Sequence, residues 1–251
     1  MIRALEVLDL LGQSQIGLGL TQISEQTHLN SSTVHRLLTT LAARGYVRQD
    51  GASKKYLLGP QCLRLTQAAL THFDMRAEAI IPLRKLALEA RELANLAQLS
   101  GFEAIYVAQA PAERNMQMFT TLGARVPLHC SGVGKVLLAY LPEADLQRVL
   151  ERGSLSAYTA QTITNVLKLQ EELALIRRRG YGVDNEEREL GVRCVAAPVF
   201  GADGRVAAAV SISGPSGRVT LERQAELSLR VMVAGREISE RLGYRAPAAV
   251  D

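Results

Sequence analysis

Short hydroxyl side chains and a long cationic side chain follow one another between residues 31 and 36. Ser31, Ser32 and Thr33 stand in a row, and Arg36 comes shortly after them. Hydroxyls at the beginning of a helix let the backbone approach phosphate groups, and the helix N-terminus attracts their negative charge. An arginine is long enough to bond a guanine edge through two hydrogen bonds. These residue types therefore suit a helix that enters the major groove of double-stranded DNA.

The candidate DNA contacts extend from this helix to a hairpin behind it. His35 and Thr39 share the polar side of the predicted helix with Arg36, opposite an apolar stripe. Lys54 and Lys55 fall on the predicted hairpin, where they would contact phosphates and position the protein without reading sequence. The candidate DNA-binding residues are Ser31, Ser32, Thr33, His35, Arg36, Thr39, Lys54 and Lys55. The same pattern also fits a small helical domain with an ordinary solvated face.

Small polar side chains gather on the predicted strand 205–213 as well. Successive side chains of a strand point to opposite faces. One face would carry Val206, Ala208, Val210 and Ile212, and the other Ala207, Ala209, Ser211 and Ser213. The first set suits a core, and the second suits either the wall of a cavity or a solvent-exposed face.

A glycine-containing segment, residues 131–134, precedes an apolar helix predicted over 132–141. Free backbone N–H groups at a helix start bind anions, and glycine permits close approach. The alternative is a glycine-containing helix cap with nothing bound, because the segment lacks a complete phosphate-binding loop.

The positions of the three cysteines do not favour a catalytic site or a metal site. Cys62, Cys130 and Cys194 lie far apart with no C-x-x-C pair, which argues against a zinc ribbon or a disulfide framework and fits a reducing cytoplasm. His129 precedes Cys130 directly, and neighbours on an extended chain point to opposite faces, so they are a poor catalytic pair. We therefore expect no enzyme, no metal site and no cofactor, with a thiol-redox or metal sensor as an alternative. The Glu186–Glu187 pair is expected on a solvated or salt-bridged surface.

The first 59 residues predict three short helices and a hairpin, the pattern of a winged helix-turn-helix. Gly12 is expected to end the first helix, Thr21 to cap the second, and Asn30 or Ser31 to cap the third. Leu5, Leu8 and Leu11 are expected on the apolar face of the first helix. The helices are predicted over 2–12, 22–27 and 32–45, and the hairpin strands over 46–48 and 55–58, with Asp50-Gly51 as a turn signal.

The rest of the chain predicts an α+β domain with a mostly antiparallel sheet, because its strands cluster without a strict βαβ repeat. Residues 61–93 are expected to be helical with a break near 72–74. Strands are predicted over 95–99, 103–109, 116–121, 182–186, 193–200 and 205–213. Further helices are predicted over 132–141, 143–152, 165–180 and 220–242, the last with Leu227, Val231, Ala234, Ile238 and Leu242 on one face. The domains would be 1–59, a helical linker 60–74, and 75–251.

Composition narrows the class of protein. The 251 residues are 47% hydrophobic, which excludes a disordered chain, and no apolar run approaches the roughly 18 residues needed to cross a bilayer. Tryptophan is absent and aromatic residues are 4%, which disfavours a surface that stacks single-stranded bases. The net charge is only +4, but half of it falls in residues 1–59, with six basic and four acidic side chains. A local basic stripe of this kind indicates nucleic acid better than the total charge does.

The motifs together resemble the IclR family of bacterial transcriptional regulators. Residues 32–38 resemble the recognition helix of the family, and residues 19–24, 45–47 and 56–59 resemble the rest of its helix-turn-helix and wing. Residues 126–139, 180–187 and 191–200 resemble its C-terminal signature, although Gly201 stands where the family usually has Asp or Asn, which would loosen a turn. The similarity covers roughly residues 2–243.

The resemblance implies a winged helix-turn-helix, a helical linker and a GAF-like effector domain. It implies an effector site formed by backbone groups of Gly132 and Val133 and by side chains of Asp184, Cys194, Ser211 and Ser213. Such a site suits a small metabolite that bears a carboxylate. Asp184 would accept a hydrogen bond from the ligand or be protonated.

The expected function is therefore a cytoplasmic repressor or activator that forms homodimers or homotetramers. Its affinity for operator DNA would be controlled by an organic acid. A ligand-gated protein-interaction module with a degenerate helix-turn-helix is the alternative from another class, and a small enzyme of the pocket domain is the third.

Overall fold

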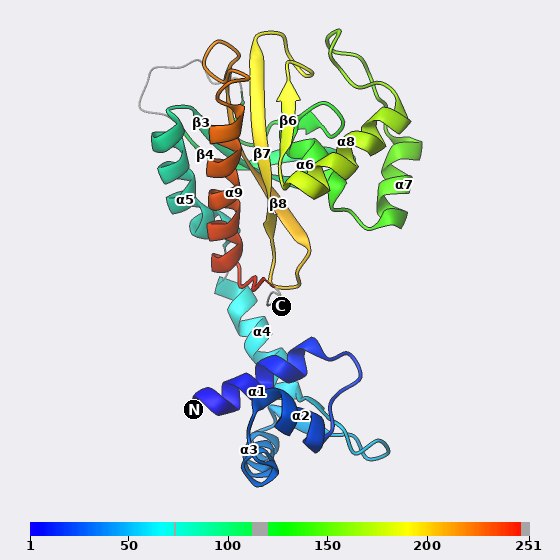
Figure 1. Cartoon of the computed structure of the whole chain (residues 1–251), viewed down its shortest axis with the longest axis vertical. Helices are drawn as coiled ribbons and strands as arrows, with labels where there is room; N and C mark the ends of the chain where they lie inside the picture. The colour runs from blue at the N-terminus through cyan, green and yellow to red at the C-terminus, as the bar shows by residue number, and fades with distance from the viewer. Residues whose placement is uncertain (73, 112–119, 247–251) are drawn as a thin grey trace. The chain divides into compact units, whose positions relative to one another are not determined.

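The structure is a computed structural model that describes residues 1–72, 74–111 and 120–246 (Figure 1). The chain divides into two compact units, Met1–Phe73 and Asp74–Asp251. Among the described residues, no helix is long and apolar enough to span a membrane.

The first unit is a helix-turn-helix followed by a hairpin. Its elements are α1 (Ile2–Gln13), α2 (Leu20–Thr27), α3 (Ser31–Ala43), β1 (Val47–Gln49), β2 (Tyr56–Leu58) and α4 (Pro60–His72). The strands pair antiparallel, with Val47 opposite Leu58. Its core consists of Val7, Leu11, Ile23, Val34, Leu38 and Val47. Burial of these side chains on α1, α2 and α3 leaves the opposite face of α3 exposed.

Two of the predicted helix boundaries in this unit are wrong. Gly12 does not end α1, which continues to Gln13 before Ser14 turns to an extended conformation. Thr21 does not cap α2: the helix begins at Leu20, and Gly19 donates its backbone N–H to Gln22 Oε1 at 2.9 Å. A glutamine reaching back from the first turn thus replaces the expected hydroxyl cap.

The third helix and the hairpin lie where they were expected, although α3 spans Ser31–Ala43 instead of 32–45 and the strands Val47–Gln49 and Tyr56–Leu58 instead of 46–48 and 55–58. Asn30 caps α3, because its Oδ1 accepts from the Thr33 backbone N–H at 2.9 Å. His28 lies in the turn between α2 and α3 and adopts a left-handed conformation (φ 54°). Leu5, expected on the apolar face of α1, is instead exposed, and Val7 takes a place in the core with Leu11.

The second unit is built on a six-stranded antiparallel sheet with the order β5-β4-β3-β8-β7-β6. The strands are β3 (Leu93–Ser100), β4 (Glu103–Ala110), β5 (Arg125–Pro127), β6 (Gly182–Asn185), β7 (Val192–Phe200) and β8 (Val206–Pro215). The helices are α5 (Met75–Ala90), α6 (Gly132–Ala139), α7 (Glu143–Arg152), α8 (Val166–Arg179) and α9 (Gln224–Arg241). The predicted α+β class with an antiparallel sheet is confirmed.

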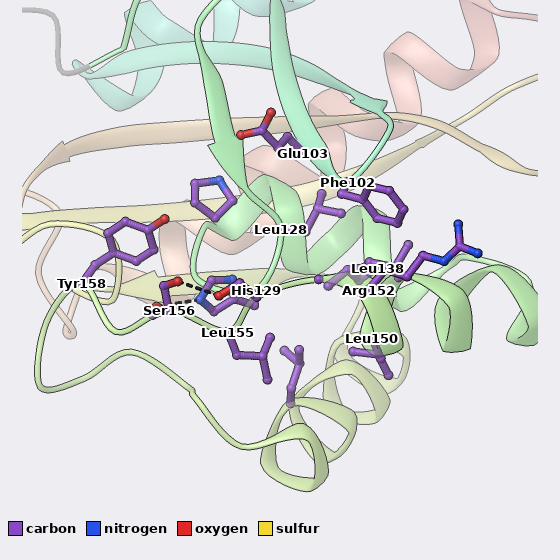
Figure 2. A pocket seen from close by; sticks show the side chains of 15 residues that line it. Phe102, Glu103, Leu128, His129, Leu138, Leu150, Arg152, Leu155, Ser156 and Tyr158 are labelled. Atoms are coloured by element: carbon purple, nitrogen blue, oxygen red, sulfur yellow. Dashed lines mark hydrogen bonds between the residues drawn. The ribbon is translucent and has the colours of Figure 1, made fainter.

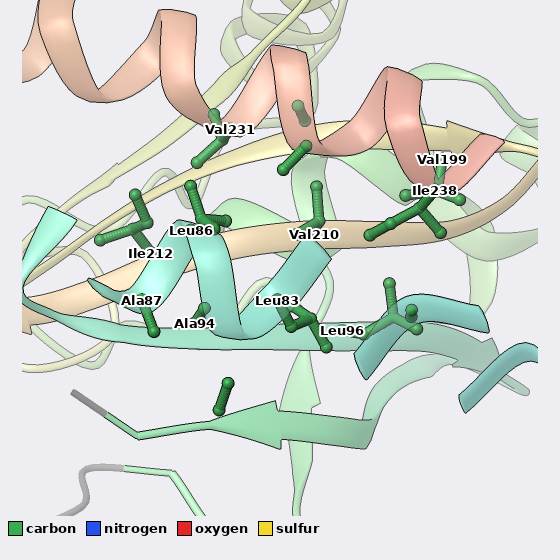
Figure 3. Packing of buried hydrophobic residues seen from close by; sticks show 14 of the residues in the cluster. Leu83, Leu86, Ala87, Ala94, Leu96, Val199, Val210, Ile212, Val231 and Ile238 are labelled. Atoms are coloured by element: carbon green, nitrogen blue, oxygen red, sulfur yellow. The ribbon is translucent and has the colours of Figure 1, made fainter. Parts of the chain in front are cut away.

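Helices cover both faces of this sheet. On one face, α5 and α9 pack side by side, with α5 mainly over β3 and β4 and α9 mainly over β7 and β8. Leu83 and Leu86 of α5 belong to the same buried cluster as Val210 and Ile212 of β8 (Figure 3). The apolar face predicted for the last helix is confirmed, since Leu227, Val231, Ala234, Ile238 and Leu242 are all buried there. On the other face lie α6 and α8, whose buried residues include Val136 and Leu173.

The alternation predicted for residues 205–213 holds only in part. Val210 and Ile212 belong to the core under α5 and α9, as expected, but Val206 packs with the cluster on the opposite face. The register shifts where Val199 pairs with Ala208 and Phe200 with Val206. Such a bulge reverses the side-chain alternation beyond it. The face that carries Ser211 is not exposed to solvent, because α6 covers it.

Three further expectations for this unit need correction. Leu93 begins β3 instead of ending a helix, and the short strand β5 was not predicted. The predicted strand 116–121 falls mostly on residues outside the described ranges, and Thr120 and Thr121 are not in a strand. Gly201 does not loosen the turn after Phe200. Its N–H donates to Arg205 O at 2.8 Å, and Asp203 accepts from the Arg205 N–H, so hydrogen bonds close the turn.

Candidate nucleic-acid interface and ligand cavity

The exposed face of α3 carries the residues predicted to contact DNA. Ser31, Ser32, His35, Arg36 and Thr39 are exposed, and Thr33 is half-buried. Val34 and Leu38 lie on the opposite side, where they are fully buried. The helix therefore presents one polar face with Arg36 near its middle, although nothing in the structure tests the contact of each residue with DNA.

Hydrogen bonds fix the beginning of α3. The Ser32 hydroxyl donates to Asn30 Oδ1 at 3.0 Å, and the Ser31 hydroxyl lies 3.4 Å from Ser24 Oγ on α2. The Ser24 hydroxyl in turn donates to the Leu29 carbonyl. The serines thus orient the first turn of α3 and join it to α2.

The hairpin places its two lysines differently. Lys54 is exposed and adopts a left-handed conformation (φ 59°), whereas Lys55 is half-buried. Asp50 accepts from the Ser53 backbone N–H and from its hydroxyl, both at 2.7 Å, and these bonds lower the pKa of the Asp50 carboxyl. The turn is therefore longer than an Asp-Gly hairpin, and its positive φ falls on Lys54 rather than Gly51.

A cavity of about 220 Å³ in the second unit brings together four of the six predicted effector residues. Gly132, Asp184, Cys194 and Ser213 line it. Val133 is buried with its side chain in the core under α6. Ser211 is also fully buried, and its Oγ has no hydrogen-bond partner among the described residues.

The N-terminus of α6 forms one wall of this cavity. The Ser131 side chain caps the helix, because its Oγ accepts from the Gly134 N–H at 3.1 Å and donates to Pro127 O at 2.7 Å. The N–H groups of Gly132 and Val133 belong to the first turn, where a helix offers them no acceptor. A Cβ at Gly132 would lie 3.0 Å from Cys194 Sγ, so glycine permits the close approach of α6 to β7.

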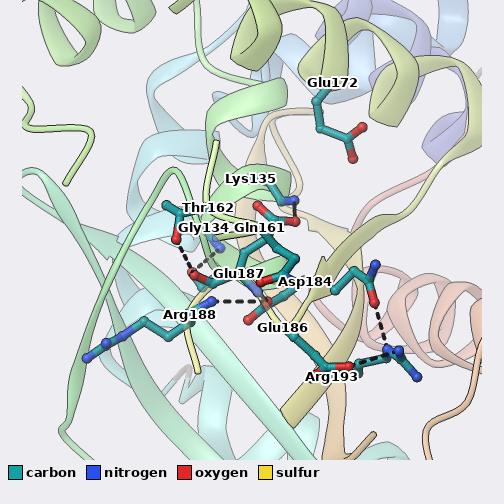
Figure 4. A network of polar contacts seen from close by, with 12 residues as sticks. Gly134, Lys135, Gln161, Thr162, Glu172, Asp184, Glu186, Glu187, Arg188 and Arg193 are labelled. Atoms are coloured by element: carbon teal, nitrogen blue, oxygen red, sulfur yellow. Dashed lines mark hydrogen bonds and ion pairs between the residues drawn. The ribbon is translucent and has the colours of Figure 1, made fainter. Parts of the chain in front are cut away.

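Asp184 is a buried carboxyl at the edge of the cavity. Its Oδ1 accepts from the backbone N–H of Glu187 at 2.8 Å and of Arg188 at 3.3 Å (Figure 4). Burial outweighs these bonds and raises the pKa of Asp184 to about 7. At neutral pH the carboxyl is therefore present in both protonation states, which is the property expected of a group that either accepts from or donates to a ligand.

The turn that follows Asp184 rests on a buried ion pair. Lys135 Nζ bonds Glu187 Oε1, and both side chains are more than nine-tenths buried. Glu187 Oε2 has no partner among the described residues, and burial raises the pKa of its carboxyl. Glu186 instead pairs with Arg193 at 2.9 Å. The expectation of a salt-bridged pair is thus met, but a solvated surface is wrong for Glu187.

Sequence reasoning did not find a polar network that includes Thr120 and Ser213 of the cavity wall. Asn95 on β3 is fully buried, and its Oδ1 accepts from Gln109 Nε2 and from the Thr120 hydroxyl, both at 3.0 Å. Its Nδ2 lies 3.4 Å from Ser213 Oγ. Of these four residues only Ser213 was expected at the site, because Asn95, Gln109 and Thr120 come from segments that the fold alone brings together.

The histidine and cysteines do not form a catalytic group. His129 lines a separate cavity of about 260 Å³, where Nε2 lies 3.0 Å from Ser156 O, and burial lowers the pKa of its ring (Figure 2). Burial raises the pKa of the Cys130 thiol to about 12 and that of Cys194 to about 11. Both thiols are thus protonated at neutral pH, which is the opposite of an activated nucleophile. Among the described residues, no cluster of acidic, histidine and cysteine side chains could hold a metal ion.

Comparisons with known proteins cover almost the whole chain. Residues 2–51 match the model of the IclR helix-turn-helix domain, and residues 67–240 match the model described as the bacterial transcriptional regulator IclR C-terminal domain. The chain is 40% identical to the HTH-type transcriptional regulator BhcR of Paracoccus denitrificans, over 98% of this chain and 88% of that protein. It is 37% identical to the transcriptional repressor IclR of Escherichia coli, over 95% and 88%.

Solved structures agree with these relatives. The crystal structure of an IclR transcriptional regulator from Silicibacter sp. TM1040 superposes with a TM-score of 0.85, at 28% identity, over 98% of this chain and 96% of that one. The structure of HmgR from Pseudomonas aeruginosa gives a TM-score of 0.76 at 31% identity, over 97% and 98%. The two sequence relatives and the Silicibacter protein are each described as a transcriptional regulator or repressor.

Proposed function

The chain belongs to the IclR family of DNA-binding transcriptional regulators, and from this premise we propose that a small carboxylic acid in the cavity beside α6 controls its affinity for operator DNA. Binding of DNA would use the exposed face of α3 and the β1–β2 hairpin. The acid would act by binding one conformation of the protein more tightly than another, which shifts the affinity for DNA by the same free energy.

The observation that carries the choice of ligand is the composition of the cavity wall. The first-turn N–H groups of Gly132 and Val133 suit a carboxylate, because they carry the positive end of the α6 dipole. Asp184 and Ser213 line the same cavity and suit a hydroxyl or carbonyl on the ligand. Cys194, protonated at neutral pH, completes the wall without adding charge.

The roles of the DNA-facing residues follow from their placement. Arg36 is exposed in the middle of α3 and would read a base edge, with His35 and Thr39 beside it. Ser31, Ser32 and Thr33 would hold a phosphate at the helix start, and Lys54 and Lys55 would contact phosphates from the hairpin.

We further propose that the protein works as a homodimer or homotetramer in the cytoplasm, with α4 as part of the linker between its two units. A dimer requires a palindromic operator whose half-sites lie about one helical turn, roughly 34–36 Å, apart. Free, widely separated thiols are compatible with the reducing cytoplasm.

The double substitution Ser211→Ala and Ser213→Ala tests the effector site. We expect it to weaken binding of small organic acids, measured by calorimetry, while operator affinity without acid, measured by gel shift, stays at the wild-type value. Both hydroxyls belong to the second unit, so their loss leaves the α3 surface intact. Equal loss of acid binding and of operator binding would contradict the assignment.

A further inference from the structure

We propose that Arg188, which lines the cavity and is held against the ring of Tyr158 from the neighbouring cavity, binds a second carboxylate and so selects a dicarboxylic acid as the effector. This inference rests on the proposed function, since it assigns a ligand class to the same cavity. Neither residue was among those expected to bind the effector.

Arg188 is placed by the turn that carries Asp184. Its backbone N–H donates to Asp184 Oδ1, and its side chain extends away from that carboxyl (Figure 4). The residue is exposed, lines the cavity, and holds its guanidinium 4.3 Å from the centre of the Tyr158 ring. A guanidinium stacked on an aromatic face keeps the N–H groups at its edge free for a carboxylate.

The charge of Arg188 acts on Tyr106, which lines the cavity, and on Cys130. Burial raises the pKa of the Tyr106 hydroxyl and of the Cys130 thiol, and Arg188 opposes the rise at both. Of the described residues that line the cavity, Arg125 also carries a positive charge. Its guanidinium, however, is paired with Glu103 at 3.5 Å and lies 3.3 Å from Ser100 Oγ. Arg188 has no carboxylate partner within the described ranges, so it is the cation left for a ligand.

The Tyr158 ring is a fixed platform for this cation. The Tyr158 backbone N–H donates to Thr162 Oγ1 at 3.0 Å, and the Thr162 hydroxyl donates to Glu187 O at 2.6 Å. Next to it, the Thr159 hydroxyl donates to Glu186 O at 2.7 Å. The loop is therefore bonded to the same turn that carries Arg188. Such preorganisation lowers the entropy lost when the guanidinium binds an anion.

The cavity volume sets the length of the acid. A cavity of about 150 Å³ accommodates benzene, whose non-hydrogen atoms are the six carbons of its ring. By the same ratio, about 220 Å³ accommodates about nine, the size of a four- or five-carbon dicarboxylic acid. One carboxylate would bind at the N-terminus of α6 and the other at Arg188, with Asp184 and Ser213 left for a hydroxyl between them.

Calorimetry with two four-carbon acids tests the inference on the full-length protein. Succinate has two carboxylates and butyrate has one, so the ratio of their Kd values isolates the second. We expect succinate to bind at least about tenfold more tightly, since bidentate charge-assisted hydrogen bonds are the strong ones. Arg188→Gln should bring the ratio to about one, and Arg188→Lys should give an intermediate value because it keeps the charge but not the planar fork. Tyr158→Ala should lower the ratio as well.

Arg178→Gln is the matched control, because Arg178 is an exposed arginine of the same unit that does not line the cavity. It should leave the ratio at the wild-type value. If Arg188→Gln leaves the preference for succinate intact, or weakens both acids alike, the inference is wrong. If Ser213→Ala then still weakens the binding of both acids, the proposed function stands without the inference about Arg188. If neither acid binds the wild-type protein, both the inference and the carboxylic-acid effector are wrong.

Discussion

Replacement of Asp184 by Asn should make the second unit more stable, and more so at alkaline pH. Asparagine has the same shape and its Oδ1 accepts the two backbone N–H bonds that Asp184 Oδ1 accepts from Glu187 and Arg188. It carries no charge, so it avoids the cost of holding an ionised carboxyl in a buried site. The comparison therefore isolates that cost from the hydrogen bonds of the turn.

The sign and size of the effect follow from the pKa of Asp184. Burial raises it from 3.8 to about 7, so the folded state holds the proton more tightly than the unfolded state. Stability is then lost as pH rises from about 4 to about 7 and is constant above that. At about 1.4 kcal/mol per pH unit, the cost is about 4 kcal/mol at pH 8 and about 1.5 kcal/mol at pH 5.

Thermal unfolding of the full chain at both pH values measures the difference. The Asn variant should gain about 2.5 kcal/mol more over wild type at pH 8 than at pH 5, which for a unit of this size is roughly 5–10 °C in Tm. Asp203→Asn is the control, because Asp203 is exposed and also accepts a backbone N–H bond. An equal effect of Asp184→Asn at the two pH values would refute the reasoning.

Three other substitutions or treatments give distinct outcomes. Arg36→Ala should cost roughly 1–3 kcal/mol of operator binding and relax the sequence specificity at one base position. Lys54→Ala should instead weaken the binding of all DNA sequences alike, as measured by gel shifts over a range of salt. Uniform weakening by Arg36→Ala would mean that Arg36 contacts only phosphate. Lys135→Met should lower the free energy of unfolding, measured in urea, by about 3–5 kcal/mol, because it leaves Glu187 buried and unpaired. Adding Glu187→Leu should restore most of the lost stability. A double variant that recovers no stability would contradict this account of the pair. Of the three free cysteines, half-buried Cys62 should react first with a thiol reagent at pH 8, and rapid labelling of buried Cys130 or Cys194 would instead favour a redox sensor.

Periodicity predicted the elements wherever one face of an element is buried. Val34 and Leu38 repeat at helical spacing on α3, and their burial explains why Arg36 is exposed. The same reasoning placed Val210 and Ile212 correctly on β8. It failed at Val206, because a bulge is set by pairing with a distant strand rather than by the local sequence.

The residues around the cavity were predictable only where a motif carried them. Gly132, Asp184, Cys194 and Ser213 came from the family resemblance, and the fold brings them to one cavity. Asn95 had no such signal, since its partners lie on other segments.

Two charged residues near the cavity were missed for related reasons. Lys135 stands in an apolar helix, and its buried partner is distant in sequence. In the sequence, Arg188 cannot be distinguished from an ordinary charged surface residue, and only the structure shows its contact with Tyr158.

The central claim is that an acid in the cavity of the second unit changes the affinity of the first unit for DNA. Fluorescence anisotropy with an operator duplex, selected from a random-sequence library, measures it directly when repeated with and without saturating succinate. Coupling between two sites is typically about 5–150-fold in affinity. The account predicts a change of that size in the wild type, and none in the Ser211→Ala, Ser213→Ala variant, whose operator affinity without acid should be normal. An identical succinate effect in both proteins would contradict it.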